Sequence, residues 1–313
     1  VDNTAIDLRV SCLPVVFGEK IVMRILFKTN ILMKLEQLSF LEDTLEKFRK
    51  VYLQPHGIIL VTGPTGSGKS TTLSAVLNEL NDPETNIMTV EDPVEYQIKG
   101  INQVQVNVKA GLTFASALRA FLRQDPDIIM VGEIRDAETA RIATQAALTG
   151  HLVLSTLHTN DAPSSITRLI DMGIEPFMVA STVIGIVAQR LVRGICKNCK
   201  IEYELKPEDP IRMMIQPALP PEIRPDQPVV FYKGKGCKNC NESGYAKRIA
   251  VHEVMVMNKE LMALTCKNVS ADILREASIK AGMRTLMMDG LVKALRGMTT
   301  VDEVIRIAYT GEQ

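Results

Sequence analysis

The chain has 313 residues, of which 46% are hydrophobic types, and it carries 36 Lys and Arg residues against 36 Asp and Glu residues. This composition is typical of a folded globular protein and excludes disordered and fibrous chains. At about 150 residues per domain, the length predicts roughly two domains with room for a third small module. A net charge of zero, with 4% aromatic residues and no Trp, provides neither a basic field nor a stacking surface, so nucleic acid is not an expected partner.

The longest uncharged apolar stretch covers residues 176–189, PFMVASTVIGIVAQ. Its 14 residues fall short of the roughly 20 that span a bilayer, so the stretch predicts a buried helix instead. The first residues lack both an initiator Met and the pattern of a signal peptide. We therefore expect a fragment of a longer, cytosolic protein.

The N-terminal part of the chain predicts short β-strands. Polarity alternates over residues 7–11, and residues 20–27 follow a turn at Gly18. Residues 31–37 then lead into a pattern in which apolar side chains recur every three or four positions. This pattern predicts an amphipathic helix over residues 42–52.

Short apolar runs alternate with helical patterns in the middle of the chain. The predicted strands are residues 58–62, 87–90, 128–131 and 152–157. The predicted helices are residues 115–123 capped by Thr113, residues 138–148 capped by Asp136 and closed by Gly150, and a third capped by Ser164 and closed by Gly173. Strands that alternate with helices predict an α/β fold with a mostly parallel sheet.

The pattern changes after Arg193. Up to about Arg248, Pro residues interrupt the chain and predict mainly irregular structure, so we expect a separate, loop-rich module. Beyond it, short helices are predicted over residues 271–282, 286–296 and 301–309.

Residues 63–70 read GPTGSGKS and fit the pattern G-x-x-x-x-G-K-[ST] between an apolar strand and a helix. Small residues let backbone N–H groups surround phosphates at a helix N-terminus, Lys69 reaches the β- and γ-phosphate oxygens, and the Ser70 hydroxyl can bind Mg²⁺. The alternative is a Gly-rich turn that only joins the strand to the helix. The residues expected to bind the nucleotide are Gly63, Pro64, Thr65, Gly66, Ser67, Gly68, Lys69, Ser70 and Thr71.

Three carboxylates, Glu91, Asp92 and Glu95, follow the next predicted strand. The carboxyl ends of parallel strands face the crevice where such sheets bind ligands. Repulsion among the three groups favours a bound cation, or a role for one of them in orienting a water that attacks the γ-phosphate. A solvated acidic loop is the alternative.

Two further polar residues follow later strands. Glu133 comes after residues 128–131, where a phosphate-loop ATPase often has its Mg²⁺-associated carboxylate; a simple surface Glu is the alternative. His158 follows residues 152–157 and is a candidate for sensing the γ-phosphate or stabilising developing charge. A hydrogen-bonded structural role is the alternative for His158 and for His151 at the start of that strand.

Four of the six cysteines form two Cys-x-x-Cys pairs separated by 37 residues. The pairs are Cys196 with Cys199, and Cys237 with Cys240. Four thiolates in this arrangement predict a tetrahedral Zn²⁺ site with a structural role, because four protein ligands leave no open position for water. For the other two, Cys12 and Cys266, small buried side chains are predicted.

Four sequence blocks in this order resemble those of secretion ATPases: GPTGSGKS, TVEDPVE, DIIMVGEIRDAETA and TGHLVLSTLHTNDA. In that family they are the phosphate loop, the Asp box, an atypical Walker B motif and the His box. The resemblance is to the branch of type II secretion and type IV pilus assembly, and it runs from residue 7 to about residue 304. The resemblance does not distinguish an ATPase of type II secretion from an ATPase of type IV pilus assembly.

The resemblance implies a homohexamer of RecA-like ATPase domains on the cytoplasmic face of the inner membrane. In the family, ATP hydrolysis with Mg²⁺ drives extension of a pilus or pseudopilus through a membrane platform protein. The N-terminal region of these proteins docks onto a membrane-anchored partner. The localisation implied here is therefore cytoplasmic and peripheral to the inner membrane, through protein contacts. The four cysteines also resemble the assembly branch rather than the retraction motors.

The resemblance also implies a role for individual residues. Glu95 matches the base that orients water, Glu133 matches the residue at the Mg²⁺ together with Ser70, and Glu91 and Asp92 match supporting carboxylates. The arginines that match charge stabilisers around the nucleotide are Arg9, Arg24, Arg119 and Arg123. Without the family, exposed surface arginines would be the alternative for all four.

Four segments follow from this interpretation. We expect the remnant of a small PAS-like α+β domain with its linker in residues 1–50 and a RecA-like ATPase core in residues 51–192. A four-cysteine zinc module is expected in residues 193–248, and a C-terminal helical region in residues 249–313.

Three other functions compete with this interpretation. A nucleotide-dependent switch needs fewer charged groups than Glu95, Glu133 and four arginines. A small-molecule kinase with a zinc lid would have its lid inside the catalytic core rather than after the last core strand. A RecA-type nucleic-acid translocase needs a basic groove, which a chain with zero net charge and few aromatic residues does not favour.

Overall fold

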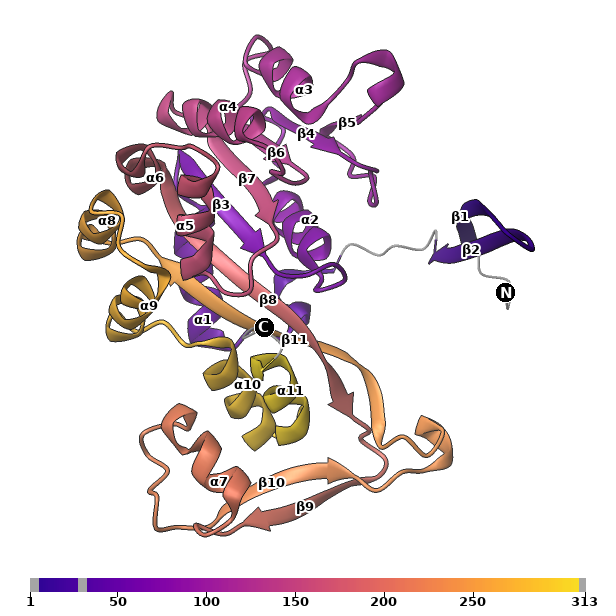
Figure 1. The fold of residues 1–313 in the computed structure, drawn as a ribbon, viewed down its shortest axis with the longest axis vertical. Helices are drawn as coiled ribbons and strands as arrows, with labels where there is room; N and C mark the ends of the chain where they lie inside the picture. Colours follow the sequence, from indigo (N-terminus) through magenta and orange to yellow (C-terminus); the bar gives the residue numbers. More distant parts are fainter. Residues whose placement is uncertain (1–5, 28–32, 310–313) are drawn as a thin grey trace. The chain divides into compact units, whose positions relative to one another are not determined.

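The computed structural model describes residues 6–27 and 33–309 (Figure 1). The chain divides into two compact units, residues 1–33 and residues 34–313. Of the segments predicted above, residues 1–5, 28–32 and 310–313 lie outside the described residues.

Residues 6–27 of the first unit form an antiparallel hairpin. Strand β1 (Ile6–Val15) pairs with β2 (Gly18–Phe27), and Gly18 adopts a φ of +126°, which a residue with a Cβ rarely does. The strands predicted over residues 7–11 and 20–27 are thus confirmed, and both are longer than predicted.

One face of this hairpin is mainly apolar, and the other mixes charged and apolar residues. The cross-strand pairs on the apolar face are Leu8 with Ile25, Val10 with Met23, and Cys12 with Ile21. On the other face, Arg9 lies directly opposite Arg24. The prediction that Cys12 is buried is wrong, because a two-stranded hairpin has no second layer to cover the face on which Cys12 lies.

A seven-stranded sheet forms the centre of the second unit, in the order β11-β8-β3-β7-β6-β4-β5 (Figure 1). Neighbouring strands are parallel except β11, which runs antiparallel to β8. Its strands are β3 (Gly57–Thr62), β4 (Ile87–Glu91), β5 (Asn102–Gln105), β6 (Ile128–Val131), β7 (Leu152–Leu157), β8 (Val183–Ile195) and β11 (Tyr245–Val256). The predicted α/β fold with a mostly parallel sheet is confirmed.

Helices cover both faces of this sheet. The helices are α1 (Glu42–Tyr52), α2 (Lys69–Leu80), α3 (Phe114–Phe121), α4 (Ala137–Leu148), α5 (Pro163–Asp171), α6 (Pro176–Thr182), α7 (Pro210–Ile215), α8 (Lys259–Cys266), α9 (Ala271–Lys280), α10 (Leu286–Leu295) and α11 (Val301–Tyr309). Helices α3 to α6, α8 and α9 share one large apolar core with the sheet, whereas α1 and α2 contact the opposite face of β8. No helix in the described ranges combines the length and the apolar character needed to cross a membrane.

The predicted helix caps are confirmed in two of three cases. The side chains of Thr113 and Asp136 accept hydrogen bonds from the backbone of the helices that they precede. Ser164 does not cap α5, because Pro163 already occupies the first helical position; instead, Asp161 Oδ1 accepts a hydrogen bond from the Ser164 N–H at 2.8 Å. Cys266 at the end of α8 is exposed, so the prediction of a buried side chain is wrong there too.

The prediction of a single buried helix over residues 176–189 is wrong. Helix α6 ends at Thr182, and β8 begins at Val183. Residues 183–188 are rich in β-branched side chains, which fit a pleated surface better than a helix. Gly185 lets α1 approach this strand, since a Cβ there would lie 2.6 Å from Val51 Cγ1.

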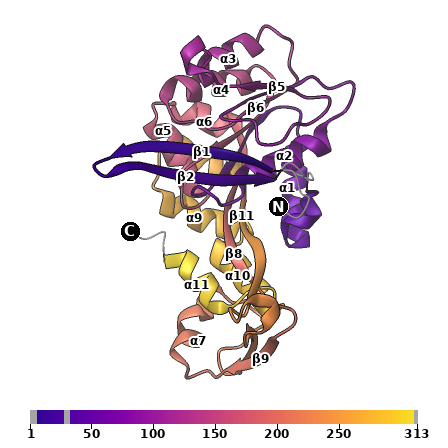
Figure 2. The same cartoon turned by 90° about the vertical axis from the view of Figure 1, so that its right-hand side faces the viewer.

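The cysteine-containing segment is more regular than predicted. Strands β9 (Lys200–Leu205) and β10 (Val229–Gly234) pair antiparallel, and α7 lies between them in sequence. Ile215 and Phe231 of this segment share a buried core with Leu291 and Val304 of α10 and α11. In both views β8 and β11 extend from the central sheet toward this segment (Figure 2). The region predicted to be helical from residue 249 onward begins with the second part of strand β11, which ends at Val256. The boundaries of the four predicted segments stay predictions.

A buried ion pair lies between α10 and the sheet. Lys293 Nζ is 2.5 Å from Asp289 Oδ2 and donates to the Ala250 carbonyl at 2.8 Å, and both side chains are 0% exposed. Asp289 Oδ2 also accepts a hydrogen bond from the His252 N–H at 3.0 Å. Burial raises the pKa of Asp289 and lowers that of Lys293, because each charge loses its hydration.

We predict that Lys293→Met lowers the free energy of unfolding by about 3–5 kcal/mol, because it leaves the buried Asp289 carboxylate without its partner. Urea unfolding followed by circular dichroism measures this change. The matched control is Lys50→Met, which breaks an exposed pair with Glu46 of the same i,i+4 spacing and is expected to change stability little. Equal effects of the two substitutions would contradict the argument.

Candidate functional site

The predicted phosphate loop joins the buried strand β3 to the N-terminus of α2. Lys69 Nζ turns back over the loop and donates to the carbonyls of Gly63 at 2.8 Å and Pro64 at 3.1 Å. Ser70 is exposed in the first turn of α2, where the N–H groups of a helix have no intrahelical acceptor. The loop therefore presents an amine, a hydroxyl and unpaired N–H groups together, which is the donor set that phosphate binding requires.

An unpartnered hydroxyl supports this interpretation. Ser67 Oγ is buried and has no hydrogen-bond partner among the described residues. Buried polar groups are almost always paired, so a hydroxyl left without a partner at this loop is suited to an anionic ligand.

Glu133 lies at the same edge of the sheet, two residues after the end of β6. Its Oε1 is 2.5 Å from Arg135 Nη2, and its Oε2 is 3.4 Å from His158 Nε2 at the end of β7. Burial lowers the pKa of Lys69, and the carboxylate of Glu133 acts in the opposite direction. The structure thus brings Glu133, His158 and the lysine of the phosphate loop into one electrostatic neighbourhood.

Three more carboxylates lie at the carboxyl end of β4: Glu91 is the last residue of the strand, and Asp92 and Glu95 follow it. Glu91 is buried and accepts hydrogen bonds from Thr89 Oγ1 at 2.7 Å and Gln103 Nε2 at 3.0 Å. Burial raises its pKa, which these hydrogen bonds partly offset.

Glu95 is exposed and lies near Glu91. Its neighbour Tyr96 contacts the first turn of α2, with its hydroxyl 3.3 Å from Thr71 Oγ1. The segment that carries Glu95 is therefore placed beside the first turn of α2. Asp92, the third carboxylate, is exposed. The hydrogen bond to Glu133 raises the pKa of Arg135, and the negative charge of Asp92 adds to this effect.

The four predicted arginines lie in two places. Arg119 at the end of α3 pairs with Glu138 of α4 at 2.5 Å, and Arg123 Nη1 donates to the Arg119 carbonyl at 2.8 Å. Arg9 and Arg24 are neighbours in the first unit. Their predicted contacts with nucleotide stay predictions.

His151 lies at the opposite end of β7 from His158. Its Nδ1 is 2.9 Å from the Ala146 carbonyl and 3.2 Å from Thr149 Oγ1. These contacts agree with a hydrogen-bonded structural role for His151.

Two residues of β8 at this edge were missed by sequence reasoning. Gln189 hydrogen-bonds to both Ser67 and Thr72, and Arg190 donates to the Asn160 carbonyl at 3.2 Å and to Asn160 Oδ1 at 3.0 Å. Both side chains are buried. The sequence signal was a Gln-Arg pair at the end of the apolar run 176–189. Because that run predicts a helix, the sequence does not show that the pair lies at the end of a strand.

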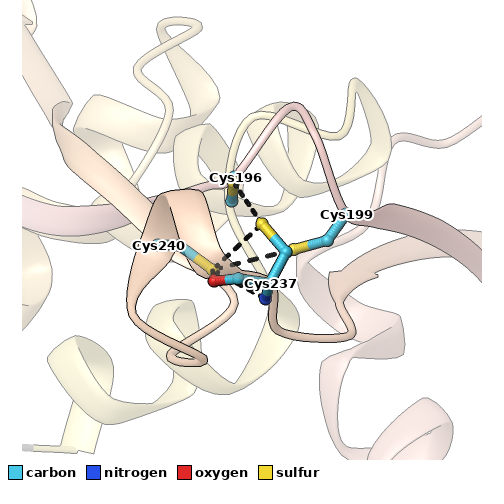
Figure 3. A group of neighbouring side chains, drawn as sticks. All are labelled: Cys196, Cys199, Cys237 and Cys240. Carbon is cyan, nitrogen blue, oxygen red and sulfur yellow. Dashed lines mark hydrogen bonds between the residues drawn. The ribbon is translucent and has the colours of Figure 1, made fainter.

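The four cysteines converge as the spacing predicted (Figure 3). All four sulfurs lie within 4.8 Å of one another, and the Cys196–Cys237 and Cys199–Cys240 sulfurs are each 3.9 Å apart. A tetrahedron with metal–sulfur bonds of about 2.3 Å has edges of about 3.8 Å, so the arrangement fits Zn²⁺. Backbone N–H groups of Cys237 and Gly244 point at Cys240 Sγ at 3.2 and 3.3 Å, which would stabilise a thiolate.

Comparison with known protein families matches residues 1–306 to the family described as Type II/IV secretion system protein. The chain belongs to this family. The resemblance found from the four sequence blocks is thereby confirmed.

Curated members of the family are similar over nearly the whole chain. The type IV pilus assembly ATPase PilB of Thermus thermophilus is 53% identical over 300 residues, which are 96% of this chain and 33% of that protein. The type II secretion system ATPase E of Vibrio cholerae is 48% identical over 307 residues, which are 98% of this chain and 59% of that protein. The chain thus spans a third to three fifths of the length of these two relatives. It is similar both to a pilus assembly ATPase and to a secretion system ATPase.

Two solved structures are similar to this chain in fold. The pilus retraction motor PilT with bound ADP has a TM-score of 0.69 at 28% identity, over 96% of this chain and 73% of PilT. The Legionella pneumophila ATPase DotB has a TM-score of 0.68 at 22% identity, over 97% of this chain and 73% of DotB. The second likeness concerns the fold alone.

We predict that Cys237→Ser removes the bound metal and lowers the thermal unfolding midpoint, because three thiolates hold Zn²⁺ less well than four. Elemental analysis of the reduced protein measures the metal, with about one Zn²⁺ per chain expected before substitution. Cys266→Ser is the control, since that exposed cysteine lies outside the cluster. Absence of stoichiometric metal from the reduced, unsubstituted protein would contradict the assignment.

Proposed function

We propose that this chain is the ATP-hydrolysing part of a motor that drives assembly of a pseudopilus or a type IV pilus. The observation that carries the proposal is the meeting of Lys69, Glu133 and His158 at the carboxyl edge of β3, β6 and β7. The names of the relatives, which are assembly and secretion ATPases, support the same activity.

The residues around the phosphate loop suit this reaction. The loop N–H groups and Lys69 bind the β- and γ-phosphates and remain paired with them as charge moves toward the leaving oxygen. Mg²⁺, when bound, neutralises charge on the β- and γ-phosphate oxygens, and Ser70 and Glu133 would hold it. Glu95 accepts a hydrogen bond from the attacking water and orients it.

The arginines would complete the site from outside the core. Like charges directly opposite each other on a hairpin repel, so the Arg9–Arg24 pair is favoured by an anion that bridges it. A nucleotide phosphate is such an anion, and a guanidinium fork matches its oxygens. Arg119 and Arg123 are exposed and are proposed to act across a neighbouring boundary.

We further propose a homohexamer at the cytoplasmic face of the inner membrane. A membrane platform protein and a membrane-anchored partner of the secretion or pilus machine would bind it. The zinc module would stabilise the fold without taking part in hydrolysis. A nucleic-acid translocase, the main alternative, would show salt-dependent stimulation of ATP hydrolysis by DNA.

We predict that Glu95→Gln retains ATP binding but lowers turnover by about 10²- to 10⁴-fold, because the neutral carboxamide still accepts a hydrogen bond but is too weak a base to take the proton of the attacking water. Lys69→Ala is expected to lose both binding and turnover. Phosphate release and calorimetric titration with ATP and Mg²⁺ measure the two properties separately. The control is Glu84→Gln, another exposed carboxylate, and an unchanged rate in Glu95→Gln would rule out the assignment of the base.

We also predict that specific activity rises with protein concentration. If the arginines act across subunit boundaries, the isolated monomer lacks part of the charge stabilisation. Phosphate release measured over a dilution series, with light scattering on the same samples, tests this. Specific activity that is independent of the oligomeric state would count against the ring.

A further inference from the structure

The side chain of Gln189, on strand β8, contacts both the phosphate loop and helix α2. It is 2% exposed. Its Nε2 donates to the Ser67 carbonyl at 2.9 Å, and its Oε1 accepts a hydrogen bond from Thr72 Oγ1 at 2.7 Å. One carboxamide therefore ties the end of the loop to the first turns of α2.

This contact fixes the orientation of one peptide group in the loop. The Ser67 carbonyl and the Gly68 N–H belong to the same planar trans peptide and point in opposite directions. Because Gln189 holds the carbonyl, the Gly68 N–H is turned away from β8. Gly68 immediately precedes α2, so this N–H is among those that a helix N-terminus leaves without an intrahelical acceptor.

The same strand explains two glycines of the motif. A Cβ on Gly68 would lie 2.7 Å from Gln189 Nε2, and a Cβ on Gly63 would lie 2.4 Å from the Gln189 carbonyl oxygen. Both glycines also have positive φ angles, of +92° and +146°. The loop is thus shaped to fit against Gln189, in addition to any ligand that it binds.

We propose that Gln189 is a positioning residue for the nucleotide phosphates. By holding the Ser67 carbonyl toward β8, it directs the Gly68 N–H to the bound phosphate. The residue acts through the loop backbone and need not touch the nucleotide. This inference rests on the proposed function, because it requires that the loop bind ATP or ADP.

The test is calorimetric titration of ADP with Mg²⁺ into the protein and its Gln189→Met variant. Methionine has a similar length but neither hydrogen bond, so the Kd is expected to rise about tenfold, the loss typical of one buried hydrogen bond. In steady-state assays the KM for ATP should rise similarly, while kcat at saturating ATP changes less than threefold. Gln189→Glu keeps the acceptor for Thr72 but loses the donor to Ser67, and it should bind as weakly as Gln189→Met.

Two further variants separate positioning from stability. Val187→Ala removes buried side-chain volume from the same strand and is expected to lower the unfolding midpoint while leaving the Kd within twofold. Thr72→Val frees one side of the carboxamide and should raise the Kd by a smaller factor than Gln189→Met. If Gln189→Met does not fold, Gln189→Glu and Thr72→Val decide the matter.

The outcomes are distinct for the two proposals. Unchanged affinity in Gln189→Glu and Thr72→Val, with binding abolished by Lys69→Ala, would overturn the role of Gln189 and leave the nucleotide site intact. An equal loss of affinity in Val187→Ala would also overturn it, since the effect would then follow stability. Failure of the unsubstituted protein to bind ADP would overturn the proposed function itself.

Discussion

Parallel strands that end at one edge of a single sheet are the constraint on which the candidate site depends. Strands β3, β4, β6 and β7 run in the same direction, so the loops after them meet although they are far apart in sequence. Lys69, Glu91, Glu133 and His158 lie at or just beyond the ends of these four strands. An edge where Lys69 and Arg135 lie among carboxylates suits a ligand that combines phosphates with a metal ion.

Residues for which we expect no catalytic role also stabilise the carboxyl edge of the sheet. Glu253 of β11 is buried and accepts hydrogen bonds from the N–H groups of Ala162 at 2.8 Å and Leu286 at 3.2 Å, and burial raises its pKa to about 7. Asp161 beside it pairs with Arg275 of α9 at 2.6 Å. The loop that presents His158 is thereby attached to the C-terminal helices, so these helices help to hold the site.

Local patterns allowed much of this structure to be predicted. The phosphate loop and the paired cysteines are recognisable because their chemistry requires particular residues within a few positions of one another. The α1 helix was predicted with its observed bounds because its apolar residues repeat at the helical period. By contrast, β8 was missed because it is buried on both faces and lacks alternation, so its apolar run resembles a buried helix. Gln189 and Arg190 were missed with it, since their partners lie elsewhere in the chain.

The Gln189–Ser67 hydrogen bond joins residues 122 positions apart, and this separation bears on how the protein is made. A chain emerging from the ribosome contains the complete eight-residue motif long before β8 has been synthesised. During that interval the loop lacks the strand that shapes it, and forming the contact later requires closure of a long loop of chain. A fragment ending before residue 183 would therefore carry the nucleotide-binding sequence without the fold that organises it.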